Sequence, residues 1–230
     1  MKPQQASPAH LRVWDLPTRL FHVTFALVVV GAIACAKLGS GWMTWHTRLG
    51  IVALALCVFR VVWGLVGPRT ARFSQFLVSP VRAWQYLRGG VNTHAAQVGH
   101  NPAGGWAVIA MLVIIGFQGV TGLFVFDDIS IEGPLARYVS EAMSSTLTGL
   151  HKLNEKPLFA ILLLHFVAIA VYTLKGRHIV RPMITGDVPQ ASVPAGTPAT
   201  RDDTATRLTA LVIAALAATG AWWLLGLMQG

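Results

Sequence analysis

Charged residues are scarce in this chain. Asp, Glu, Lys and Arg make up 12% of its 230 residues, whereas a soluble domain usually carries about 25%. Apolar residues reach 54%, and the mean hydropathy is clearly positive at +0.57. This composition excludes an ordinary soluble domain and predicts an integral membrane protein. The net charge of +9 does not indicate nucleic acid binding, because the cations flank apolar runs.

Cysteine is also rare. The two cysteines, Cys35 and Cys57, both lie inside apolar runs, where we expect small core residues and no disulfide. No CxxCH motif is present, which excludes covalent attachment of haem at such a motif. We also expect no cleavable signal peptide, because the first residues are polar and the first apolar run is long enough to span.

Five apolar runs reach or approach the length of about 20 residues that crosses a bilayer as a helix. They predict an all-α membrane protein with five spanning helices. The fourth run is expected to extend back to His151. The runs are Leu20–Leu38, Trp45–Val66, Trp106–Phe126, Pro157–Leu174 and Leu208–Met228.

The lysines and arginines predict the orientation of these helices. With the N-terminus in the cytoplasm and the C-terminus outside, 13 of the 18 cations fall on the inner side. The positive-inside rule favours this arrangement. Four acidic residues then gather on the outer side, namely Asp127, Asp128, Glu132 and Glu141.

The stretches between the runs predict further organisation. Pro80–Leu87 is expected to form a short interfacial helix in the inner loop, and Asp127–Gly149 to form the longest outer loop. Gly186–Thr200 is rich in Pro, Ala, Ser and Thr, which is typical of a flexible linker. We therefore divide the chain into a membrane domain at 1–187, a linker at 188–205 and an additional transmembrane helix at 206–230. This last helix has no histidine, and we expect it to serve packing or partner docking.

Four of the eight histidines fall in or near the apolar runs, at two depths. His46 and His151, here called the outer pair, open the second and fourth runs at the outer surface. His22 and His165, the inner pair, lie toward the inner side. His151 and His165 are 14 residues apart, so one helix presents both on nearly the same side, roughly 21 Å apart along its axis. The others, His10, His94, His100 and His178, are expected to be solvated or interfacial.

Two trans-facing imidazoles at each of two depths favour two haems with bis-histidine ligation. A haem is a flat, largely apolar disc that fits between helices, and two neutral imidazoles satisfy its iron from opposite faces. A zinc site would need additional Cys, His or carboxylate ligands. A proton relay would favour carboxylates within the membrane, and the apolar runs contain none. Hydrogen-bonded structural histidines remain the alternative for any single position.

Other residues are candidates for contact with a haem. Gly50 follows His46 by four residues on the same helical face, where it would let a macrocycle approach, or simply allow helix packing. Arg60 is placed to meet a propionate of an inner haem, or to snorkel to the inner surface. Arg19, Arg48 and Lys152 are further candidates for propionates.

Four motifs, together with the order of the four histidines, resemble the bacterial cytochrome b561 / nickel–iron hydrogenase cytochrome b-subunit family. The resemblance covers roughly residues 10–187, and formate dehydrogenase gamma-type cytochromes look similar in helix layout. The motifs are VWDLPTRLFH (Val13–His22), WHTRLG (Trp45–Gly50), GHNPAGGW (Gly99–Trp106) and RPMITG (Arg181–Gly186).

The resemblance implies two non-covalent b haems in a four-helix bundle of the bacterial inner membrane, followed here by a fifth helix. Carried over by position, the ligands are His46 with His151 and His22 with His165. The family often has a glutamate after the first histidine of the fourth helix, where this chain has Lys152. The fifth helix could not be aligned to the family by motif.

Three functions compete at this point. The first is electron transfer between the membrane quinone pool and an outer c-type cytochrome or a dehydrogenase or hydrogenase subunit. The second is a self-contained superoxide:quinone oxidoreductase, since some related proteins oxidise superoxide, and outer cations such as Arg48 and Lys152 would attract it. The third is an anchor or transporter without haem. The outer acidic residues suit a cationic protein partner better than a small anion.

Overall fold

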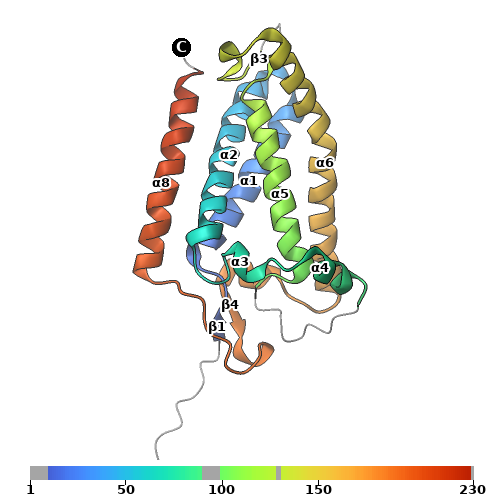
Figure 1. Ribbon diagram of the computed structural model, residues 1–230, viewed down its shortest axis with the longest axis vertical. Coiled ribbons are helices and arrows are strands. Elements are labelled where there is room, and N and C mark those ends of the chain that lie inside the picture. Colours follow the sequence, from blue (N-terminus) through green and yellow to red (C-terminus); the bar gives the residue numbers. More distant parts are fainter. Residues whose placement is uncertain (1–9, 90–98, 128–130, 229–230) are drawn as a thin grey trace, which may run out of the picture.

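Five long helices form the body of the protein (Figure 1). The computed structural model describes residues 10–89, 99–127 and 131–228. Within these ranges, five helices are long and apolar enough to span a bilayer. The chain is therefore an all-α integral membrane protein, as its composition predicted. The five helices are α1 (Leu16–Leu38), α2 (Met43–Val66), α5 (Pro102–Gly122), α6 (Glu141–Leu174) and α8 (Thr204–Gly226).

Helices α1, α2, α5 and α6 make a four-helix bundle, and α8 packs along α2 at its edge (Figure 1). All four bundle helices contribute to one apolar centre, formed by Val29, Ala53, Cys57, Ile115 and Leu158. Between α8 and the α1–α2 face lies an apolar groove of about 590 Å³, lined on α8 largely by alanines. The bundle with a fifth helix is the architecture that the sequence predicted.

Short elements cover the two ends of the bundle (Figure 1). One end, here called the ribbon end, is the predicted inner side and has a two-stranded antiparallel ribbon in which Arg12 pairs with Asp187. Its elements are β1 (His10–Arg12), α3 (Phe73–Phe76), α4 (Pro80–Leu87), α7 (Val180–Thr185), β4 (Asp187–Pro189) and a 3-10 turn at Gln190–Ser192. The opposite end holds 3-10 turns at Ser40–Trp42 and Ala136–Tyr138, and the hairpin of β2 (Phe126–Asp127) and β3 (Ile131–Glu132). Helix α4 has the bounds that the sequence predicted.

Local capping explains where the long helices begin. Asp15 accepts a hydrogen bond from the Thr18 N–H at 2.8 Å, and Pro17 lies in the first turn of α1. Ser140 caps α6 by accepting from the Met143 N–H. The predicted outer loop Asp127–Gly149 was therefore too long, because α6 begins at Glu141. Pro157, where the fourth apolar run begins, lies inside α6, and a spanning helix tolerates its missing N–H.

Residues 188–205 carry specific contacts that their composition did not predict. The Thr200 N–H donates to the Arg12 carbonyl at 2.8 Å. The Asp202 side chain, 7% exposed, accepts from the Leu16 N–H and pairs with both Arg12 and Arg207. Asp202 therefore connects β1, the start of α1 and the first turn of α8. This carboxylate thus anchors the start of the fifth helix, which also packs along α2.

Removing this charge should loosen the fifth helix. We expect Asp202→Asn to lower the free energy of unfolding by about 1–2 kcal/mol, because charge-assisted hydrogen bonds are lost. The loss stays modest because Arg207 is half exposed and its ion pair is screened by solvent. Thermal denaturation in detergent measures this. Asp203→Asn is the matched control, because Asn retains the cap that Asp203 provides to the Thr206 N–H. Equal stability of the two variants would contradict the assignment.

The same carboxylate predicts a dependence on pH. Burial alone would raise the pKa of Asp202, but hydrogen bonds from Arg207 and the Leu16 N–H outweigh it and lower that pKa. A lowered folded-state pKa means stability that is present above the unfolded value of about 3.9 and lost as pH falls through the folded value. Wild-type protein should therefore lose more stability than Asp202→Asn on acidification below about pH 4.

Candidate functional site

The outer pair faces each other across the bundle. The ring centroids of His46 on α2 and His151 on α6 lie 6.1 Å apart, with the ring planes at 80°. The Nδ1 atom of each ring lies within hydrogen-bond distance of a backbone carbonyl, at 2.9 Å from Ala32 O and 3.0 Å from Gln118 O. Such a bond holds the proton on Nδ1 and leaves Nε2 for a metal.

A pocket of about 360 Å³ surrounds the outer pair, and both imidazoles line it. Gly50 lines it too, and a Cβ built there would meet nothing within 4 Å. A Cβ on Gly122 would lie 3.0 Å from Cε1 of His151, so this glycine makes room for the ring. The glycines therefore leave space for a flat group beside the imidazoles.

Polar residues that the sequence reading missed hold His151 in place. Gln118 on α5 donates to the His151 carbonyl at 3.1 Å, and its amide nitrogen lies 3.1 Å from Nε2 of the ring. Asn154, one turn after His151, donates to the Gln118 side-chain oxygen at 2.7 Å. A signal was available, because Gln118 is a strongly polar residue inside the third apolar run. A metal on Nε2 of His151 would require the Gln118 amide to turn away.

The inner pair also faces each other across two helices, at the other level of the bundle. The ring centroids of His22 on α1 and His165 on α6 lie 6.4 Å apart, with the planes at 52°. Helix α6 thus supplies one histidine to each pair, while α1 and α2 supply one each. The structure brings the four histidines together in the two pairs that the sequence predicted.

The spacing within each pair suits one metal ion. Metal–nitrogen bonds of about 2 Å on both sides put imidazole centroids about 6 Å apart, close to the 6.1 and 6.4 Å found here. In the part of the chain that the structure describes, no three His, Cys, Asp or Glu side chains gather as a metal site. A haem would supply the further ligands of such a metal through its four ring nitrogens. The residues present therefore fit a haem at each level.

The predicted cations differ in their surroundings. The Arg60 side chain is buried, with the residue 3% exposed, and both terminal nitrogens lack a hydrogen-bond partner among the described residues. Arg19 donates to the Ile184 carbonyl at 2.6 Å. Arg48 is exposed, and its guanidinium lies 5.2 Å from the centroid of the Trp45 ring. The cations that line the outer pocket are Lys37, paired with Glu155, and Lys152.

His100 is not the solvated or interfacial residue that its loop position suggested. Its ring packs against Trp14 and Phe76, with centroids 4.8 and 4.2 Å away, and its Nδ1 has no partner among the described residues. Burial, with the nearby charges of Arg60 and His22, lowers the pKa of His100 to about 3, so the ring is neutral at physiological pH. Sequence reasoning missed it because polar neighbours suggested exposure. His94 lies outside the described residues.

Comparison with known families agrees with this geometry. A comparison with curated proteins finds no match. The family model for prokaryotic cytochrome b561 matches residues 13–186. That range contains all four paired histidines and the whole four-helix bundle. Since the match spans well over half of the chain, the protein belongs to the prokaryotic cytochrome b561 family, whose members bind b-type haem in the membrane and transfer electrons across it.

Proposed function

We propose that the chain carries electrons across the membrane through two non-covalent b haems, one held by His46 and His151 and one by His22 and His165. The observation that carries the proposal is the pair of imidazole gaps, 6.1 and 6.4 Å between centroids. Each haem, when bound, supplies an iron that takes up and releases one electron. The chain's part is to fix two imidazoles per site, to hold the tautomers of the outer pair through Ala32 and Gln118, and to exclude water.

Other residues shape the two haem sites in this proposal. Gly50 gives space beside the outer pair, where Lys37 and Lys152 offer positive charge. Arg60 offers a buried guanidinium on the inner side, which suits a propionate. Arg19 and Arg48 stay predictions for propionate contact. Residues 1–187 would then form the haem-binding domain, 188–205 its connection, and 206–230 a helix that packs against it.

The proposed setting is the bacterial inner membrane, with the N-terminus cytoplasmic and the C-terminus periplasmic. The excess of cations predicted for the ribbon end supports this orientation. Trp222 and Trp223 near the other end of α8 are exposed, as expected for aromatic residues at a membrane interface.

The quinone is proposed to react near the inner pair and the loop 67–105. Polar groups at that end support this, because the Tyr172 hydroxyl lies 3.1 Å from that of Tyr86 and accepts from Asn101 at 2.8 Å. The outer partner is proposed to be a c-type cytochrome or a dehydrogenase or hydrogenase subunit. Exposed Glu132 and Glu141 support a cationic partner. Asp128 and the Asp127 side chain lie outside the part that the structure describes.

Purified protein in sealed liposomes tests the proposal. We expect about two haems b per chain, with low-spin bis-imidazole spectra. A reductant that cannot cross the bilayer, added outside, should reduce an impermeant oxidant trapped inside. Liposomes that contain haem-free protein are the control. Colourless protein, or transfer no faster than in that control, would overturn the proposal.

Superoxide oxidation is a second candidate, favoured by Lys152, which lines the outer pocket where Lys37 is paired with Glu155. Two superoxide anions would each give up one electron and become dioxygen, and one quinone would take two electrons and two protons. Rapid-mixing reduction of the haems by superoxide tests this. Substitution of Lys152 by Gln should slow that reduction about tenfold if the lysine attracts the anion, and an unchanged rate would count against it.

A further inference from the structure

Arg60 is a buried cation without a matching anion. It is 3% exposed, and its two terminal nitrogens make no hydrogen bond among the described residues. Asp15 is the acid whose charge acts on Arg60, but its oxygens already accept from Thr18 and Trp63. An unpaired charge in a membrane protein interior costs several kcal/mol. The arrangement therefore calls for an acceptor that is not part of this chain.

His100 provides a second unused polar atom beside this cation. The Phe76 ring connects the two residues, because its centroid lies 4.2 Å from that of His100 and 6.0 Å from the Arg60 guanidinium. The charges of Arg60 and of His22 in the inner pair both act on His100. The neutral His100 ring is held by Trp14 and Phe76, and its buried Nδ1 has no partner among the described residues. A neutral imidazole can donate one N–H without adding another positive charge. Arg60 and His100 thus offer several hydrogen-bond donors and a single positive charge.

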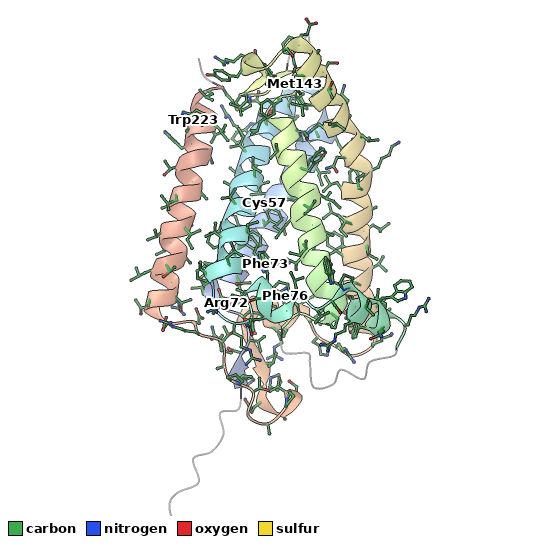
Figure 2. The ribbon with its side chains drawn as sticks, in the orientation of Figure 1. Cys57, Arg72, Phe73, Phe76, Met143 and Trp223 are labelled. Atoms are coloured by element: carbon green, nitrogen blue, oxygen red, sulfur yellow. The ribbon has the colours of Figure 1, made fainter. Side chains whose placement is uncertain are left out.

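Two aromatic rings of α3 close this region from water. The Arg60 guanidinium lies 4.9 Å from the centroid of Phe73 and 6.0 Å from that of Phe76. Phe73 packs directly on Gly64, where a Cβ would approach the ring to 2.2 Å, and Phe76 packs on Gly105. Figure 2 shows both rings on the α3 segment that crosses the bundle at its ribbon end. Bulk water is therefore a poor partner for Arg60.

We propose that Arg60 and His100 form a carboxylate-binding site that holds one propionate of the haem at the inner pair. The guanidinium fork matches a carboxylate, and the imidazole N–H adds a neutral donor. One propionate balances the one buried charge. The proposal rests on the haem assignment above and adds His100, Phe73 and Phe76 to the inner site.

The site should also set the potential of the inner haem. A cation in a water-excluded site favours the reduced, less positive iron. Replacing Arg60 by Gln should therefore favour the oxidised haem. A tenfold change in the equilibrium between the two states corresponds to about 59 mV for one electron.

Redox titration of purified protein with haem bound tests this. In Arg60→Gln we expect one of two midpoint potentials to fall by about 59 mV, a tenfold change, and the other to stay. The falling potential must be the one that disappears in His165→Ala. His100→Phe should shift the same potential in the same direction by less, and His100→Asn, which keeps an N–H near the Nδ1 position, should restore it. Arg88→Gln is the matched control, because Arg88 stacks on Trp84 outside this site.

The outcomes separate the two proposals. Loss of the inner haem in Arg60→Gln, with the outer haem retained at its normal potential, supports the site. Two haems with unchanged potentials in both Arg60→Gln and His100→Phe would overturn the propionate site at Arg60 and His100. That result would leave the proposal of electron transfer through two haems standing. Wild-type protein without haem would overturn both. If Arg60→Gln does not fold, His100→Phe and His100→Asn decide the question.

Discussion

Replacing His165 by Ala is expected to halve the haem content of the purified protein. The inner pair would lose one of its two imidazoles, which leaves His22 as its one remaining histidine. One low-spin component should vanish from the reduced-minus-oxidised spectrum. Transfer across liposomes should fall to the rate of haem-free protein, because one of the two sites in the path is missing.

A reciprocal variant and a control make this result specific. His151→Ala should remove the other spectral component, because its partner is His46 and not His22. The exposed His178, just beyond the end of α6, provides the control, and His178→Ala should keep both haems. An unchanged haem-to-protein ratio and spectrum in His165→Ala would exclude His165 as a ligand.

Removing the carboxylate of Asp15 should produce the largest loss of stability. This side chain is fully buried and accepts from the Thr18 N–H, the Thr18 hydroxyl and Nε1 of Trp63. Asp15→Ala would delete the cap of α1 and leave the buried Trp63 N–H with Thr18 as its remaining acceptor. We expect a loss of about 2–4 kcal/mol in the free energy of unfolding. Thermal or denaturant unfolding in detergent measures it.

Asp15→Asn separates capping from charge. Its carbonyl oxygen can still accept from the Thr18 N–H and Trp63, so its loss should stay below about 1 kcal/mol. Burial raises the pKa of Asp15, which means that the native carboxylate binds its proton at higher pH than the unfolded one. The stability of the wild-type protein should therefore decrease slightly as pH rises from the unfolded pKa of Asp15, about 3.9, to its higher folded pKa. Asp15→Asn should lack that decrease. Equal stability of the Ala and Asn variants would show that the hydrogen bonds do not matter.

The helices were predictable because hydropathy reports directly on transfer into lipid. Length and apolar content located all five spans, and Pro80–Leu87 was located by its proline and aromatic residues. The start of α6 was not predictable from hydropathy, because the stretch from Glu141 to Gly149 is polar enough to resemble a loop. Its helix is set by the Ser140 cap and by packing on α5.

The paired histidines were predictable because depth follows from position in a spanning helix. The residues that pack around them were not predictable. Gln118 meets Asn154 and His151 only when α5 packs on α6, and these residues are separated by more than 30 positions in the sequence. His100 lies in a polar stretch, so its burial depends on Trp14 and on Phe76 from α3. Contacts between distant segments have no local sequence signature.

Helix α6 sets the spacing between the two histidine pairs. It carries His151 and His165 on one continuous helix of 34 residues, so in the proposed function a residue count sets the distance between the two haems. Each inserted residue would advance the helix by about 1.5 Å and turn it by about 100°, and would carry one histidine away from its partner. In the proposed arrangement, the interval of 14 residues between His151 and His165 therefore cannot change without separating one histidine from its partner.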